Sequence, residues 1–205
     1  MVQETFQPFF FVGLGNPGVR YETTRHNMGF LVIQAFAKFL GLSFKKDGHF
    51  NALVAKGVVD NKTVHLLLPL TFMNLSGNAI RHYADYFKIP IDRLLVAVDD
   101  VALPFGSFRY RLKGTSGGHR GLASIENCFG SNHYKRLRMG IGHPGEKILA
   151  DFVLEPFSPA EQLELPEVIL KGVDILSHFL KEDFAGHKAD NIDPINTNPF
   201  LGPGE

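Results

Sequence analysis

The sequence predicts a single α/β domain with a mixed, mostly parallel twisted sheet and helices on both faces. Strand-like runs alternate with helical patterns along the chain, which is the arrangement of α/β proteins. Several of these runs are almost wholly apolar, as expected for strands covered on both faces. A chain of 205 residues is long enough for one domain with a substantial core. We expect this domain to span residues 1–184.

The expected strands are short apolar runs bounded by turn residues. They cover residues 9–13, 52–58, 63–68, 94–98, 107–112 and 137–141. The first of them, Phe9–Gly13, belongs to the apolar run Pro8-Phe-Phe-Phe-Val12, and the fourth is equally apolar. We therefore expect both to lie inside the sheet.

The expected helices are recognised by their apolar faces and their end signals. Residues 30–40 are apolar almost all round except at Gln34 and Lys38, which indicates a buried helix. Ser76 is a candidate cap for a helix that ends before Pro90. Shorter and longer helical patterns cover residues 121–129 and 166–180. From residue 185 the chain is rich in Asn, Pro and Gly, which predicts a disordered tail over 185–205.

Composition places the chain among soluble intracellular proteins. No apolar run approaches the length of a membrane span, and the first residues lack the basic region of a secretory signal. Cys128 is the single cysteine, so an intrachain disulfide is impossible and a reducing cytoplasm is the expected setting.

The formal net charge is zero, but the charges are unevenly distributed. Residues 105–145 hold seven Lys or Arg against one acidic residue, whereas residues 146–205 hold four basic and twelve acidic residues. A basic middle segment is compatible with a nucleic-acid partner and equally with a solvated surface.

The loop after the first strand contains Gly13-x-Gly15-x-x-Gly18, which has the spacing of the dinucleotide-binding fingerprint. That motif needs a helix that opens among the glycines, so that its N-terminus holds a pyrophosphate. Pro17 disfavours helical backbone at Asn16, and the next helical pattern begins only near Gly29. Pro17 and the late helix start therefore favour a glycine loop that rigidly supports Asn16 and His26. A nucleotide-dependent enzyme is the alternative.

Polar side chains follow several expected strands at their carboxyl ends, where open α/β sheets bind ligands. These residues are Asn16 and His26, Phe72 and Asn74, Asp99 and Asp100, and His119 with Arg120 in a glycine-flanked loop. They include carboxylates, imidazoles and amides without a Ser or Cys nucleophile. This set suggests that a His supported by an Asp activates water, while amides hold a carbonyl oxygen or its oxyanion.

Residue types alone leave these roles open. A histidine at a loop end is often structural, Asn74 also suits a turn or a cap, and Asp99 and Asp100 are indistinguishable by composition. A metal site is not predicted, because none of the nine histidines lies three or four residues from another and Cys128 has no partner. Nucleophile-elbow and phosphate-loop motifs are missing as well.

Five ordered motifs together resemble the signature of bacterial-type peptidyl-tRNA hydrolases, from about residue 11 to about residue 180. They are Gly13-Leu-Gly-Asn-Pro-Gly18 with Tyr21 and Thr24-Arg-His-Asn27, Pro69-Leu-Thr-Phe-Met-Asn-Leu-Ser-Gly77, Asp99-Asp100, Gly117-Gly-His119, and Arg136-Leu-Arg-Met-Gly-Ile-Gly-His-Pro-Gly145. The resemblance implies an enzyme without a cofactor that hydrolyses the ester between a peptide and the 3′-terminal ribose of tRNA. Such an enzyme recycles tRNA from aborted translation.

The resemblance also implies roles for individual residues. His26 would be the general base, Asp99 its partner, and Asn16 would contact the peptide beside the ester and help to reject unblocked aminoacyl-tRNA. The remaining expected contacts are with the peptide, the tRNA end and the tRNA phosphates. The site for the peptide and the 3′ end would be lined by Phe72 and Asn74, Tyr21 would contact the tRNA end, and His119 would belong to the second wall of the cleft. The clamp for the 5′-phosphate and acceptor stem would consist of Arg109, Arg111, Arg136 and Arg138.

Further expectations of the resemblance are a monomer without membrane contact and a covering helix near residues 150–159. One position departs from the family, because Arg120 stands where the family usually has Asn. Arg has donors and no acceptor, so it cannot do everything that an amide does. A non-catalytic RNA-binding relative with the same cleft is the alternative to the enzyme.

Overall fold

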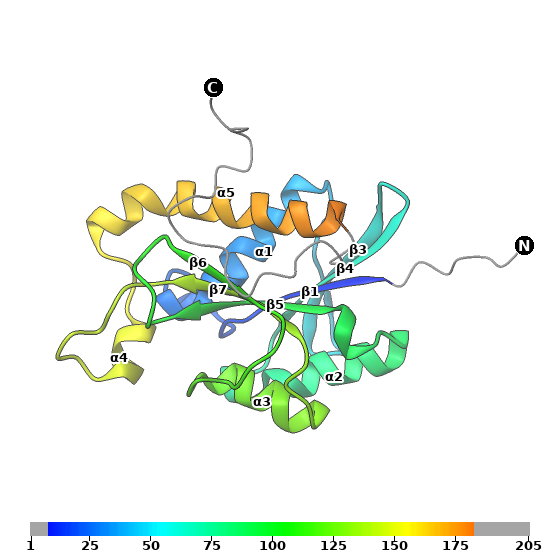
Figure 1. Cartoon of the computed structure of the whole chain (residues 1–205), viewed down its shortest axis with the longest axis horizontal. Coiled ribbons are helices and arrows are strands. Elements are labelled where there is room, and N and C mark those ends of the chain that lie inside the picture. The colour runs from blue at the N-terminus through cyan, green and yellow to red at the C-terminus, as the bar shows by residue number, and fades with distance from the viewer. Residues whose placement is uncertain (1–7, 183–205) are drawn as a thin grey trace, which may run out of the picture.

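The structure is a computed structural model that describes residues 8–182. Its centre is a seven-stranded sheet in the order β2-β3-β4-β1-β5-β7-β6 (Figure 1). The strands are β1 (Phe9–Gly13), β2 (Lys45–Asp47), β3 (Ala52–Val59), β4 (Lys62–Pro69), β5 (Leu94–Asp100), β6 (Phe108–Arg111) and β7 (Lys135–Gly140). The prediction of one α/β domain with a mixed sheet is thus confirmed.

The parallel part of the sheet lies at its centre. β1 pairs in parallel with β4 and β5, and β5 pairs in parallel with β7. The antiparallel pairs are at the two sides, where β3 joins β2 and β4, and β6 joins β7. The carboxyl ends of β1, β4, β5 and β7 therefore point the same way, and the loops that follow them meet at one edge of the sheet.

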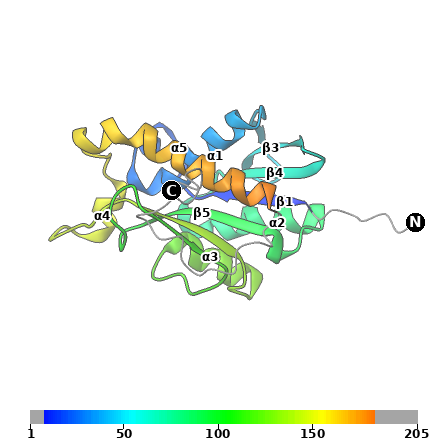
Figure 2. The same cartoon turned by 45° about the horizontal axis from the view of Figure 1, so that its top comes forward.

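Helices cover both faces, as predicted (Figures 1 and 2). The helices α1 (Met28–Phe39) and α5 (Pro159–Lys181) pack on one face, with Ile33, Phe36 and Leu176 in a shared core. The helices α2 (Ser76–Phe87) and α3 (Arg120–Phe129) pack on the other, with Ile80 and Leu122 in a second core. The short helix α4 (Leu149–Leu154) lies beyond the carboxyl ends of the strands.

Two elements differ from the sequence-based expectation for identifiable reasons. β2 was not expected, because it has only three residues and none of them is buried. α5 begins at Pro159 instead of residue 166, and Pro166 lies inside the helix. Its true start has a capping box in which the Ser158 hydroxyl and the Glu161 carboxylate accept backbone N–H groups.

The expected capping role of Ser76 is wrong. Ser76 is the first residue of α2, Leu75 occupies the cap position, and no side chain caps this end. The chain enters α2 directly from a 3₁₀ turn, Met73–Leu75, and within the described chain the Ser76 hydroxyl is buried without a partner. The 3₁₀ turn already leads the chain into α2. Ser76 is therefore a helical residue with a buried hydroxyl and does not cap the helix.

Residues 1–7 and 183–205 are outside the described part, so the tail predicted over 185–205 and the domain limit at 184 stay predictions. No helix among residues 8–182 is long and apolar enough to cross a bilayer.

Candidate active site

The glycine loop after β1 brings two segments of backbone together and does not open a helix. The chain passes through 3₁₀ turns at Val19–Tyr21 and Arg25–Asn27 before α1 begins. A Cβ atom on Gly13 would lie 2.4 Å from the carbonyl oxygen of Gly29, and one on Gly15 would lie 2.6 Å from the ring of Phe30. These glycines allow α1 to pack closely on β1, and the geometry contradicts the dinucleotide alternative.

Asn16 is held rigidly at the end of this loop. The side chain of Asn27 accepts from the Asn16 backbone N–H at 2.8 Å and donates to its carbonyl oxygen at 3.0 Å. The Asn16 Oδ1 atom accepts from the backbone N–H of Met73 at 2.9 Å. Because Oδ1 is occupied, the Nδ2 group remains as the donor that Asn16 offers to the cleft.

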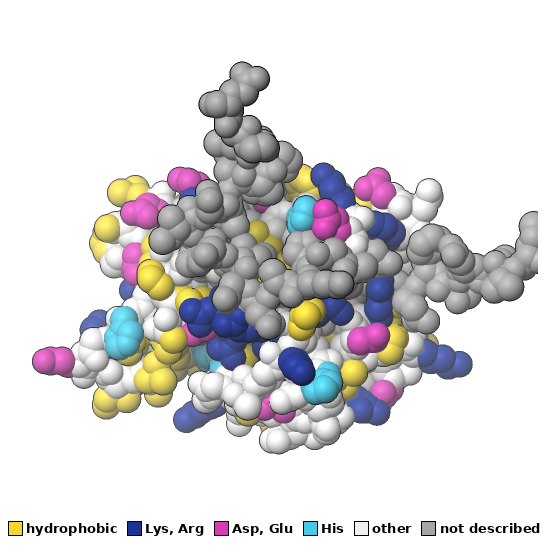
Figure 3. Space-filling model, viewed as in Figure 1, with side chains coloured by type: hydrophobic (Ala, Val, Ile, Leu, Met, Phe, Trp, Pro, Cys, Tyr) yellow, Lys and Arg dark blue, Asp and Glu magenta, His cyan; other side chains and the backbone are white. Residues whose placement is uncertain are grey.

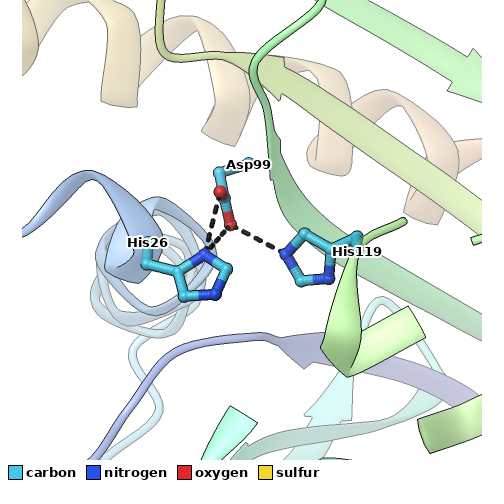
Figure 4. Close-up of side chains that lie close together, drawn as sticks. All are labelled: His26, Asp99 and His119. Carbon is cyan, nitrogen blue, oxygen red and sulfur yellow. Dashed lines mark hydrogen bonds and ion pairs between the residues drawn. The ribbon is translucent and has the colours of Figure 1, made fainter. Parts of the chain in front are cut away.

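His26 lies in the 3₁₀ turn before α1 and faces Asp99 near the end of β5 (Figure 4). Its Nδ1 atom is 3.0 Å from each Asp99 carboxylate oxygen, and the carboxylate is 2% exposed. A carboxylate only accepts, so Nδ1 carries the proton and donates. The neutral ring therefore has its lone pair on Nε2, the atom that a general base needs.

The structure separates the two adjacent aspartates that composition left equivalent. Asp100 accepts from the Arg138 guanidinium at 3.1 Å and from the backbone N–H of Ala102 at 2.9 Å. Successive side chains of a strand point in opposite directions, so only Asp99 is directed at His26.

His119 also bonds to Asp99, a contact that sequence reasoning missed. Its Nε2 atom lies 3.1 Å from Asp99 Oδ1 (Figure 4). Its Nδ1 atom accepts from the backbone N–H groups of Gly121 and Leu122. His119 is thus the N-cap of α3 as well as a partner of Asp99. The glycines that flank His119 predicted a loop before a helix, but nothing in the sequence predicted the hydrogen bond to Asp99.

The electrostatics of the pair favour a charged histidine. Burial by itself lowers the pKa of His26, but the charge and hydrogen bond of Asp99 outweigh it and raise the pKa above 6.5. Burial of Asp99 acts to raise its own pKa, and the two histidines outweigh that effect and hold the pKa well below its usual value. Arg120 opposes Asp99 weakly by lowering the pKa of His26.

Arg25, next to His26, was not singled out from the sequence. Its buried guanidinium donates to the carbonyl of Pro156 and, at 2.6 Å, to the carboxylate of Glu161, and it lies 4.5 Å over the ring of Phe152. These contacts join the turn that carries His26 to α4 and to the start of α5. The position of Arg25 directly before the candidate base His26 was the sequence feature that could have indicated its role.

A cleft of about 640 Å³ opens over these side chains. α4 lines the cleft with apolar side chains, among them Leu149 and Val153, and Phe72 and Met73 also belong to the lining. The lining residues include no Ser or Cys. Most predicted site residues share this cleft, namely Asn16, His26, Phe72, Asn74, Asp99, His119, Arg120 and Arg138.

Four predicted residues lie outside the cleft lining, namely Tyr21, Arg109, Arg111 and Arg136. Tyr21 is in a neighbouring 3₁₀ turn under the guanidinium of Arg20. Arg109 and Arg111 on β6 pair in register with Arg138 and Arg136 on β7, so the four share one face of this antiparallel strand pair. Lys and Arg side chains also lie close together near the middle of the face in Figure 3.

Burial excludes the direct contact with a tRNA phosphate that was predicted for Arg136. The residue is 1% exposed, lies 4.0 Å over the ring of Tyr134 and faces Glu126 at 3.4 Å. Arg138 is partly exposed and donates to Asp100 and to the carbonyls of Thr115 and Ser116. Arg138 therefore fixes the loop that leads to His119.

The His26, Asp99 and His119 side chains also offer three metal-ligand atoms within 4.8 Å of one another. Each of these atoms takes part in a hydrogen bond inside the group, so a metal would have to displace those bonds. The expectation of no metal and no cofactor stays a prediction.

The fold and the site together define an α/β protein with a histidine–carboxylate centre in an open, partly apolar cleft. The chain belongs to the peptidyl-tRNA hydrolase family, whose model matches residues 10–197. It is 44% identical over 176 residues to a peptidyl-tRNA hydrolase of Carboxydothermus hydrogenoformans, covering 86% of this chain and 94% of the relative. A relative from Cytophaga hutchinsonii is 43% identical over 174 residues, covering 83% and 90%.

A crystal structure of peptidyl-tRNA hydrolase from Acinetobacter baumannii has the same fold. Its TM-score is 0.81 at 34% identity, and the match covers 86% of this chain and 90% of that one. The resemblance seen in the sequence motifs is thus confirmed, and the family model matches residues 10–197.

Proposed function

We propose that this protein hydrolyses the ester between the peptide and the tRNA in peptidyl-tRNA, releasing free peptide and free tRNA. The observation that carries the proposal is the hydrogen bond between buried Asp99 and His26 in a cleft lined by amides. Membership of the peptidyl-tRNA hydrolase family supports the substrate and the reaction.

In the proposed reaction His26 Nε2 removes a proton from water while the water oxygen attacks the ester carbonyl. Asp99 stabilises the imidazolium that forms. The side-chain amides of Asn16 and Asn74 donate to the carbonyl oxygen as it becomes an oxyanion. When the tetrahedral intermediate collapses, the bond to the ribose oxygen breaks and His26 returns the proton to that oxygen.

Water is the proposed nucleophile, because the cleft lining has no Ser or Cys that would form an acyl-enzyme. For substrate binding, the apolar walls with Phe72 suit the peptide and the terminal base. The exposed part of the arginine face on β6 and β7 suits phosphates of the acceptor stem, through Arg109, Arg111 and the accessible edge of Arg138. Tyr21 is proposed to contact the tRNA end, and the protein to act as a monomer.

The test is release of peptide from an N-blocked aminoacyl-tRNA, with the unblocked form as the control substrate. Replacing His26 by Ala should lower kcat roughly 100- to 10,000-fold, because the general base is lost. His133→Ala is the matched control, since His133 is exposed and outside the cleft lining. Near-full activity of His26→Ala would remove His26 as the base.

Binding of peptidyl-tRNA by the wild-type protein without any turnover would instead identify a non-catalytic RNA-binding relative. The Asp99–His26 bond argues against that alternative, because a binding surface has no need for a buried carboxylate aligned with a histidine.

A further inference from the structure

Both ring nitrogens of His119 are used in hydrogen bonds within the protein. Nδ1 faces two backbone N–H groups at the start of α3, 3.1 Å and 3.3 Å away, and Nε2 faces Asp99 Oδ1 at 3.1 Å. The side chain is 10% exposed. His119 is therefore a residue of the cleft wall whose two ring nitrogens are both engaged within the protein.

This arrangement selects one tautomer. An N–H group donates only, so Nδ1 must be unprotonated to accept from Gly121 and Leu122. The proton of the neutral ring is then on Nε2, which donates to Asp99. His119 cannot serve as a second base, because its only lone pair is occupied by the helix start.

Asp99 consequently accepts from two histidines that approach from different elements. His26 donates from the turn before α1, and His119 donates from the loop before α3 (Figure 4). The two rings lie 5.0 Å apart and do not bond to each other. A carboxylate held from both sides has one orientation, and its negative charge is shared between two donors.

We propose that His119 is a positioning residue for hydrolysis, which orients Asp99 and limits how strongly Asp99 holds the proton of His26. The proposal rests on the proposed function, in which His26 accepts and then returns a proton. A base that binds its proton too tightly is protonated at working pH and returns the proton slowly. The second donor on Asp99 keeps His26 available in its neutral form.

The other charged groups near His26 and Asp99 are few and mostly paired, so the influence of His119 on the pKa of His26 can be measured. Arg120 follows His119 and faces the cleft, and Asp100 is neutralised by Arg138 from β7. Arg25 is paired with Glu161 on α5. The cleft residues from α4 and from the turn Met73–Leu75 are uncharged. The donor from His119 is therefore a distinct influence on Asp99.

Two substitutions separate this role from helix capping. In His119→Asn the amide oxygen takes the place of Nδ1 and still caps α3, but position 119 no longer supplies a donor to Asp99, which keeps only its bond from His26. In His119→Gln the longer side chain brings an amide donor towards Asp99 and gives up the cap. The Asn variant therefore tests the Asp99 contact, and the Gln variant is its matched control for the helix.

The first measurement is the pH dependence of kcat for N-blocked aminoacyl-tRNA, together with the melting temperature. His119→Asn should keep its melting temperature, lose about 3- to 10-fold in kcat, and move the acidic limb upward by about 0.5 to 1 pH unit. His119→Gln should keep the wild-type limb and melt about 2 to 4 °C lower. An unchanged limb and kcat in His119→Asn would reduce His119 to a helix cap, and a higher KM alone would make it a wall contact; either result overturns the proposal.

The second measurement is titration of the His26 ring by NMR, which does not depend on activity. A higher His26 pKa in His119→Asn confirms the coupling. If the NMR titration moves and the pH profile of kcat does not, the coupling stands and the assignment of His26 as the base fails. If neither moves, the coupling fails, and the activity of His26→Ala then decides the proposed function separately.

Discussion

Two histidines that are mostly shielded from solvent show how differently this fold treats the same side chain. His26 lies in a 3₁₀ turn beside the Asp99 carboxylate, which raises its pKa above 6.5 despite its burial. His65 lies on the central strand β4, 5% exposed, with Nδ1 2.8 Å from the hydroxyl of Tyr83. Burial, with a smaller contribution from Lys56, lowers the pKa of His65 to about 4.

The difference shows that the partner, and not burial, decides what a buried histidine does. A carboxylate makes the charged ring favourable, whereas a neutral hydroxyl does not compensate for its lost hydration. Only the first histidine is suited to exchange a proton at neutral pH. The second is a neutral core residue that would destabilise the fold if it became charged.

The largest expected effect comes from giving His26 a neutral partner like that of His65. Asp99→Asn keeps the shape but removes the charge, so the imidazolium is no longer stabilised. We expect kcat to fall roughly 100- to 10,000-fold, measured as peptide release. Asp100→Asn is the matched control and should lose less than about 10-fold, because Asp100 faces Arg138. Equal losses in the two variants would contradict the assignment of Asp99.

The next effect is on acid stability and comes from His65. Its folded pKa of about 4 is below the unfolded value of about 6.5, so the stabilising contribution is present above pH 6.5 and is lost as the pH falls towards 4. The full loss is roughly 3 kcal/mol. For His26 the sign is reversed, since its raised pKa contributes stability below pH 6.5 that is lost as the pH rises through the folded pKa.

Urea unfolding at pH 7 and pH 4.5 measures this loss. The double variant His65→Phe with Tyr83→Phe removes both polar partners and should reduce the loss between the two pH values. If the double variant is as acid-sensitive as the wild type, His65 does not control acid stability.

A smaller effect concerns the scaffolds of the two histidines. His65 is fixed by a regular strand, but the turn with His26 depends on the contacts of Arg25. Arg25→Met should lower kcat about 10-fold and stability by about 1 to 2 kcal/mol, since it leaves the partly buried Glu161 unpaired. Arg81→Ala, which breaks the exposed pair with Asp85, should change either quantity little. A loss of stability with unchanged kcat would show that Arg25 is structural only.

Local sequence patterns predicted most of the elements, and eight of the predicted site residues line one cleft. Apolar runs predicted six of the seven strands, and the alternation with helices predicted the mixed α/β sheet. The start of α5 and the expected cap at Ser76 were wrong, because Pro166 is a breaker only on average and a hydroxyl near a helix start need not cap it. The excess of basic residues over 105–145 was visible in the sequence, but the burial of each arginine was not. Arg136 was therefore predicted to contact tRNA phosphates, although its side chain is 1% exposed.

By itself the sequence determined that this is an α/β protein with amides, histidines and carboxylates at the carboxyl ends of its strands, and its motifs determined the family. The motifs also implied Asp99 as the partner of His26, and the tertiary structure supplied the geometry, in which Asp99 faces His26 and Asp100 faces Arg138. Only the tertiary structure decided that His119 shares the Asp99 carboxylate and that His65 is kept neutral. The physical reason is the separation along the chain of the residues that interact. Strand and helix patterns arise from neighbours a few residues apart, whereas His26 and Asp99 are 73 residues apart and meet only because β5 pairs with β1 in the folded sheet.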